Sequence, residues 1–137
     1  MPEIGINHTL KLYKLWLILG ICLLAAIVYL SLTARPLDII SFAMSDKVGH
    51  LVAYFSLMAW FGQIYVTKNQ HILLVIGFCT MGALLEGLQY LGGRRMFEYH
   101  DMMANIIGVS VGWLFTRYIV SGVLLKIDKK LIKTFSL

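Results

Sequence analysis

The chain has 137 residues, of which 59% are hydrophobic and 14% are charged, and its mean hydropathy is +0.79. Soluble domains average about 25% charged residues, so this composition excludes an ordinary soluble domain and predicts one membrane domain. The net charge of +5 comes from basic residues that lie between and after apolar segments, which favours anchoring at a membrane surface and argues against nucleic-acid binding.

Four apolar segments are each long enough to cross a bilayer. About 20 helical residues span the hydrocarbon core, and continuous apolar runs of this length are typical of helices, whereas barrel strands alternate. The expected transmembrane helices are residues 15–32, 48–66, 72–91 and 102–120. We therefore expect an all-α fold in which residues 1–137 form a single bundle of four transmembrane helices.

The positions of Lys and Arg predict the orientation of this bundle. Seven basic residues flank one side of the expected membrane, namely Lys11, Lys14, Lys68, Lys126, Lys129, Lys130 and Lys133. Four flank the other side, namely Arg35, Lys47, Arg94 and Arg95. Because basic residues are enriched on the cytoplasmic side, both termini are expected in the cytoplasm.

The C-terminal tail has the pattern of a basic amphipathic helix. Its apolar residues recur at spacings of four and three, at Val120, Leu124, Ile127, Leu131 and Phe135, with the lysines between them. Such a helix either continues from the fourth span or bends away from it near Ser121 and Gly122. A membrane anchor and a partner-docking helix both remain open for this tail.

One carboxylate falls inside the third apolar segment. Glu86 lies about 7.5 Å below the expected outer helix end, at 1.5 Å per residue. A lipid-exposed carboxylate there would cost kilocalories, so Glu86 is expected to face the bundle, to be paired or to be protonated. Gln89 follows three residues later on the same face. The alternative role for Glu86 is a buried pair with Arg95 or His50 that only holds the helices together.

Polar residues of two other segments also recur at helical spacing. The set on the second helix is Asp46, His50 and Tyr54, and the set on the fourth is Asp101, Asn105, Gly108 and Gly112. Gly108 and Gly112 form a GxxxG pattern that lets a neighbouring helix approach closely. Together with Glu86, these sets predict a polar cluster that three helices share at the extracytoplasmic end. Helix capping alone is the alternative for Asp46 and Asp101.

The segments "SDKVGHLVAYF", "EGLQYLGGRR" and "HDMMANIIGVSVG" resemble the VanZ-like family of small bacterial membrane proteins, over about residues 45–112. The positions that match the family pattern are Asp46, Lys47, His50, Tyr54, Glu86, Gln89, Arg95, Asp101, Asn105 and Gly108. The family often has Pro-Gly before a single Arg, whereas this chain has Gly92-Gly93-Arg94-Arg95, so either arginine can fill that position. The resemblance implies a multi-pass protein of a bacterial cytoplasmic (inner) membrane. Some members are linked to low-level teicoplanin resistance, and no settled biochemical activity comes with the family.

The function that these residues favour is binding of an anionic lipid headgroup or a lipid-linked envelope precursor, because Arg suits bidentate phosphate recognition. The expected binding residues are Asp46, Lys47, His50, Glu86, Gln89, Arg94, Arg95, Asp101 and Asn105, with Tyr54, Gly108 and Gly112 in helix packing. The alternative is a small membrane enzyme acting on a phosphate-bearing lipid, with His50 and Glu86 in acid–base roles and Arg95 holding phosphate. Whether the protein is an enzyme stays open, since no nucleophile constellation is visible.

No metal site and no cofactor are expected. The residues able to ligate a metal are His50, Glu86, Glu98, His100 and Asp101, but they form no HExxH or CxxC pattern. The positive charge of Arg94 and Arg95 opposes a cation. The expected partners are the bilayer and an anionic lipid, with no nucleic acid, and homo-oligomerisation stays open.

Overall fold

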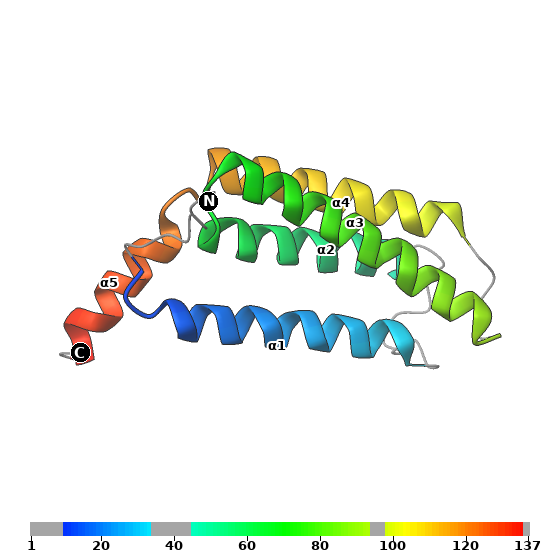
Figure 1. Cartoon of the computed structure of the whole chain (residues 1–137), viewed down its shortest axis with the longest axis horizontal. Coiled ribbons are helices and arrows are strands. Elements are labelled where there is room, and N and C mark those ends of the chain that lie inside the picture. Colours follow the sequence, from blue (N-terminus) through cyan, green and yellow to red (C-terminus); the bar gives the residue numbers. More distant parts are fainter. Residues whose placement is uncertain (1–9, 34–44, 94–97, 136–137) are drawn as a thin grey trace.

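A computed structural model of the chain describes residues 10–33, 45–93 and 98–135 (Figure 1). These residues form five helices and no strand: α1 Tyr13–Leu32, α2 Ser45–Ile64, α3 Lys68–Leu91, α4 Tyr99–Tyr118 and α5 Val123–Phe135. The predicted all-α class is therefore confirmed. The bounds of α1 to α4 lie close to those of the four apolar segments, because the same apolar residues that define the segments also form the helices.

The first four helices lie side by side, and successive helices run in opposite directions (Figure 1). The ends of α1 and α3 and the starts of α2 and α4 consequently meet at one end of the bundle, which we name the outer end. The helix α5 lies at the opposite end, beside the start of α1. The most extensive packing is between α2 and α4, while α1 contacts both α2 and α3.

The turn between α2 and α3 is closed by local side chains. Thr67 caps α3, since its hydroxyl accepts from the Gln70 N–H and the Gln70 side chain accepts in return from the Thr67 N–H. The Nε2 of His71 lies 3.0 Å from the carbonyl oxygen of Gly62 and 2.7 Å from that of Tyr65. These bonds satisfy backbone groups at the helix ends and fix the antiparallel pairing of α2 and α3.

Two glycines of α4 form the contact with α2. A Cβ atom on Gly108 would lie 2.5 Å from the backbone oxygen of Leu51, and one on Gly112 would lie 2.7 Å from that of Phe55. Only glycine fits at such distances, so the GxxxG pattern brings the two backbones together. The close approach also sets the rotation of α4, which turns Asp101 and Asn105 toward α2 and α3.

The buried core runs through the middle of the bundle and leaves apolar faces outside. Its main cluster comprises Ile27, Tyr54, Leu57, Met58, Phe61, Phe78 and Val109. Large apolar side chains such as Ile18, Leu73 and Leu84 are more than half exposed. Outward apolar surface of this extent suits lipid and not water.

Two of the described helices, α1 and α3, are long and apolar enough to cross a membrane, and a third span results if the bent pair of α4 and α5 is taken as one. The chain thus has the character of a membrane protein. The helices α2 and α4 do not meet this criterion by themselves, and both carry polar residues and glycines on their shared face. A four-span topology is accordingly taken up below as a proposal.

The tail bends away from α4 and does not continue it. The two helix axes differ by 62°, and Gly122 between them has a φ of +81°, a conformation that glycine adopts without strain. The four lysines of α5 are exposed and Leu124 is buried. A helix at the predicted place is confirmed, and Ile127 and Phe135 of the predicted apolar stripe are exposed on it.

The buried centre of α5 is instead a carboxylate, that of Asp128, which is fully buried. It accepts hydrogen bonds from the backbone N–H groups of Lys11 at 2.9 Å and Leu12 at 3.1 Å. The indole N–H of Trp16 donates to it at 2.7 Å. Asp128 therefore neutralises the N-terminal end of α1 and ties α5 to it.

Candidate functional site

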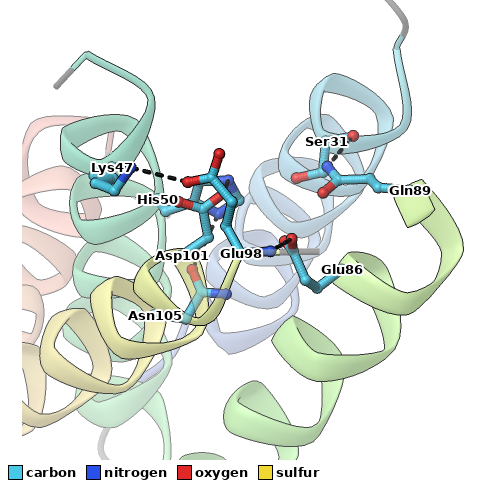
Figure 2. A network of polar contacts seen from close by, with 8 residues as sticks. All are labelled: Ser31, Lys47, His50, Glu86, Gln89, Glu98, Asp101 and Asn105. Atoms are coloured by element: carbon cyan, nitrogen blue, oxygen red, sulfur yellow. Dashed lines mark hydrogen bonds and ion pairs between the residues drawn. The ribbon is translucent and has the colours of Figure 1, made fainter. Parts of the chain in front are cut away.

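Polar side chains from α2, α3 and α4 converge at the outer end of the bundle (Figure 2). We name the four that lie together the outer cluster: His50, Glu86, Asp101 and Asn105. Glu86, Asp101 and Asn105 are each 2% exposed, and the His50 side chain is 12% exposed. Ionisable groups buried this deeply are costly to fold unless they are compensated, so they mark a candidate site.

The imidazole of His50 is held in one orientation by α4. Its Nδ1 lies 3.1 Å from Oδ1 of Asn105, and its Nε2 lies 4.0 Å from Oδ2 of Asp101. A carboxamide oxygen only accepts, so Nδ1 carries the proton and donates it to Asn105. In the neutral ring the lone pair of Nε2 then points toward the carboxylate of Asp101.

Space for Asn105 is provided by a glycine of α3. A Cβ atom on Gly82 would lie 2.8 Å from Nδ2 of Asn105 and 3.2 Å from the hydroxyl oxygen of Tyr54. Gly82 lies one helical turn before Glu86, on the same face of α3. Sequence analysis did not identify Gly82, although its spacing of four from Glu86 is the signal that could have done so.

Glu86 is the acidic member that α3 contributes. Its Oε1 accepts a hydrogen bond from the backbone N–H of Glu98 at 3.1 Å. Its Oε2 is buried and has no hydrogen-bond partner in the described part of the chain. Ligand atoms of Glu86, His50 and Asp101 all lie within 4.8 Å of one another. The cluster thus combines two carboxylates and one imidazole in a site shielded from water.

An ion pair lies at the rim of this site. The Nζ of Lys47, on α2, is 3.0 Å from Oε2 of Glu98, just before α4, and both side chains are partly exposed. Glu98 thus bridges the starts of α2 and α4. It also occupies the N-cap position of α4, so Asp101 is the third helical residue and the capping alternative for Asp101 is wrong.

The structure places the remaining expected residues elsewhere. The side-chain amide of Gln89 donates to the backbone oxygen of Ser31 and so joins α3 to α1 (Figure 2). Tyr54 is buried in the core beneath the outer cluster. Arg94 and Arg95 lie outside the described residues, as does the side chain of Asp46 at the start of α2.

Comparison with protein-family models, curated proteins and solved structures finds no match to this chain. The functional argument consequently depends on the chemistry of the outer cluster.

Proposed function

We propose that this chain is a VanZ-like protein of a bacterial cytoplasmic membrane, and that its outer end binds the phosphate of an anionic lipid headgroup or lipid-linked envelope precursor. The observation that supports this proposal best is the convergence of His50, Glu86 and Asp101 from three helices at one end of an apolar bundle. Ionisable groups held at membrane depth usually mark a ligand or ion site.

The proposed topology has four spans with both termini in the cytoplasm. The helices α2 and α4 have the same length as α1, lie alongside α3 and expose apolar residues such as Val48, Val52, Ile106 and Ile107. The excess of lysines at the opposite end, where α5 lies, would face the cytoplasm. The outer cluster would then lie on the extracytoplasmic side, at the level of the headgroups.

The positive charge needed for phosphate would come from the rim of the site. Lys47 lies on α2 beside the outer cluster, and Arg94 and Arg95 follow Gly93 in the sequence, between α3 and α4. Guanidinium groups bind phosphate oxygens in a bidentate manner, and ammonium groups act as point charges. Exposed apolar faces of α1 and α3 would hold the lipid tails alongside.

A second candidate is an enzyme that acts on a phosphate-bearing lipid. The observation favouring it is the oriented ring of His50, whose Nε2 is presented toward Asp101 as an acid–base group. Release of inorganic phosphate or a free headgroup from such a lipid by the purified protein would distinguish an enzyme from a binding protein.

Native mass spectrometry of protein extracted in lipid nanodiscs tests the binding proposal, because bound lipid and oligomeric state are measured together. The expected result is a phosphate-bearing lipid that remains bound after the annular lipids are removed. Release of all lipids at the same collision energy would contradict the proposal. The family's link to glycopeptides adds a cellular test, in which expression of the chain is expected to lower teicoplanin susceptibility.

A further inference from the structure

We propose that His50, Glu86 and Asp101 form a binding site for one divalent transition-metal ion of the zinc type. The three residues come from α2, α3 and α4, and one ligand atom of each lies within 4.8 Å of the other two. This inference goes beyond the proposed function, because it requires no lipid.

The separation of the ligand atoms is close to that of a metal site. Two ligands at about 2.1 Å from zinc lie at most about 4.2 Å apart. The Nε2 of His50 and the Oδ2 of Asp101 are 4.0 Å apart, so an ion fits between them. All three ligand atoms lie within 4.8 Å of one another, at most about 0.6 Å beyond that limit, which small side-chain rotations would remove.

The imidazole is oriented as a metal ligand would be. Because Nδ1 of His50 donates to Asn105, Nε2 is the nitrogen that faces Asp101, and in the neutral ring it carries the lone pair that a metal binds. Histidine ligands commonly donate their other ring N–H to an oxygen in this way, which fixes the tautomer and the ring plane. Asn105 would be that outer partner here, and Gly82 leaves it room.

The donor atoms of the site suit a divalent cation. Oε2 of Glu86 is buried without a hydrogen-bond partner among the described residues, which is an unusual state for a carboxylate oxygen. Two carboxylates and one imidazole are a donor set that binds divalent ions of this type. An imidazole ligand selects zinc-type ions over Mg²⁺ and Ca²⁺, which prefer oxygen alone.

The three ligand residues form no local sequence motif, for a structural reason. A motif such as HExxH arises when ligands share one helix, whereas here each helix supplies a single ligand. Three protein ligands leave a coordination position open. A phosphate oxygen would occupy this open position only if the proposed function is correct. The metal site itself does not depend on the proposed function.

Metal binding to the full chain tests the inference directly. Protein in phosphatidylcholine nanodiscs is stripped with EDTA and titrated with Zn²⁺, and with Co²⁺ as a spectroscopic probe. We expect one ion per chain, and an X-ray absorption spectrum showing imidazole nitrogen and oxygen ligands at about 2.0–2.2 Å. The absorption measurement uses the wild-type protein, so it does not depend on how variants fold.

Variants then assign the ligands. His50→Gln and Glu86→Gln are expected to weaken Zn²⁺ binding at least tenfold, while His71→Gln and Glu98→Gln retain it. His71 is a matched imidazole at the other end of α3, and Glu98 is a neighbouring carboxylate outside the ligand set. No stoichiometric ion in the wild-type protein, or equal binding by Glu86→Gln, would overturn the inference.

A lipid arm separates this inference from the proposed function. If the protein binds zinc in phosphatidylcholine nanodiscs but retains no anionic lipid in native mass spectrometry, the metal site is supported and the proposed function is contradicted. If the protein binds no zinc but retains the anionic lipid in the presence of EDTA, the proposed function is supported and the metal site is contradicted.

Discussion

Oδ1 of Asn105 lies 3.1 Å from Nδ1 of His50, so a side chain of α4 fixes the ring of a side chain of α2. Gly82 of α3 leaves room for the same carboxamide. Three helices therefore determine the orientation of one imidazole before any ligand binds. Such preorganisation is what a binding or catalytic site requires.

Replacing Asn105 by Leu should destabilise the bundle. The substitution removes the acceptor and leaves the Nδ1–H of His50 without a partner in a buried site, at a cost of about 1–3 kcal/mol. The measurement is reversible unfolding in mixed micelles, followed by circular dichroism. Ser110→Ala is the control, because Ser110 is exposed on α4 and donates only to its own helix, at Ile106. Equal free energies of unfolding for the two variants would contradict the assigned hydrogen bond.

Replacing Gly108 by Ala should separate α2 from α4. The new Cβ atom would lie 2.5 Å from the backbone oxygen of Leu51, and overpacking of this kind costs about 1–3 kcal/mol. Gly77→Ala on α3 is the matched control, since a Cβ atom there meets nothing within 4 Å. That variant should be neutral or gain up to about 1 kcal/mol from helix propensity. The same unfolding assay checks both, and a neutral Gly108→Ala would show that α4 does not pack this closely.

Replacing Asp128 by Ala should release α5 from α1. The carboxylate accepts three hydrogen bonds from residues at the start of α1, and a bond to a charged acceptor contributes about 1.5–3 kcal/mol. Trypsin cleavage after Lys129 or Lys130 should accelerate at least tenfold in nanodiscs. Thr134→Ala, at an exposed position of the same helix, should cleave at the wild-type rate. Similar cleavage rates for the two variants would mean that other contacts hold α5.

The membrane orientation can be measured by thiol labelling. In a chain with Cys22 and Cys79 replaced by Ser, an impermeant maleimide should label Glu98→Cys on intact cells. It should label Lys68→Cys only after permeabilisation, because Lys68 begins α3 at the opposite end of the bundle. The reverse pattern would place the outer cluster in the cytoplasm.

The sequence predicts helices and faces well, because hydropathy and helical spacing are local properties. The bounds of α1 to α4 follow from hydropathy, and the common face of Asp101 and Asn105 on α4 follows from their spacing of four residues. Contacts between helices are not local. Gly82 gains its role only when α3 and α4 are placed side by side, and Glu98 becomes a bridge only when α4 begins beside Lys47.

Asp128 is the clearest case of a role that the sequence hides. It lies between lysines in the sequence of an amphipathic helix, where an acidic residue is normally expected to be exposed to solvent. Its partners include the backbone N–H groups of Lys11 and Leu12, and no side-chain pattern reveals such donors. The distances among His50, Glu86 and Asp101 depend on the fold in a similar way, since the three side chains come from three different helices.

The most direct test of the central claim, that the outer end binds a phosphate-bearing lipid, is retention of that lipid measured by native mass spectrometry on charge-matched variants. Arg94→Gln combined with Arg95→Gln removes two positive charges from the segment between α3 and α4 in the sequence. Lys129→Gln combined with Lys130→Gln removes two from α5, where both lysines are exposed. We predict that the first pair lowers retention of the lipid at least tenfold and that the second pair leaves it unchanged. Equal retention by the two double variants would contradict the account.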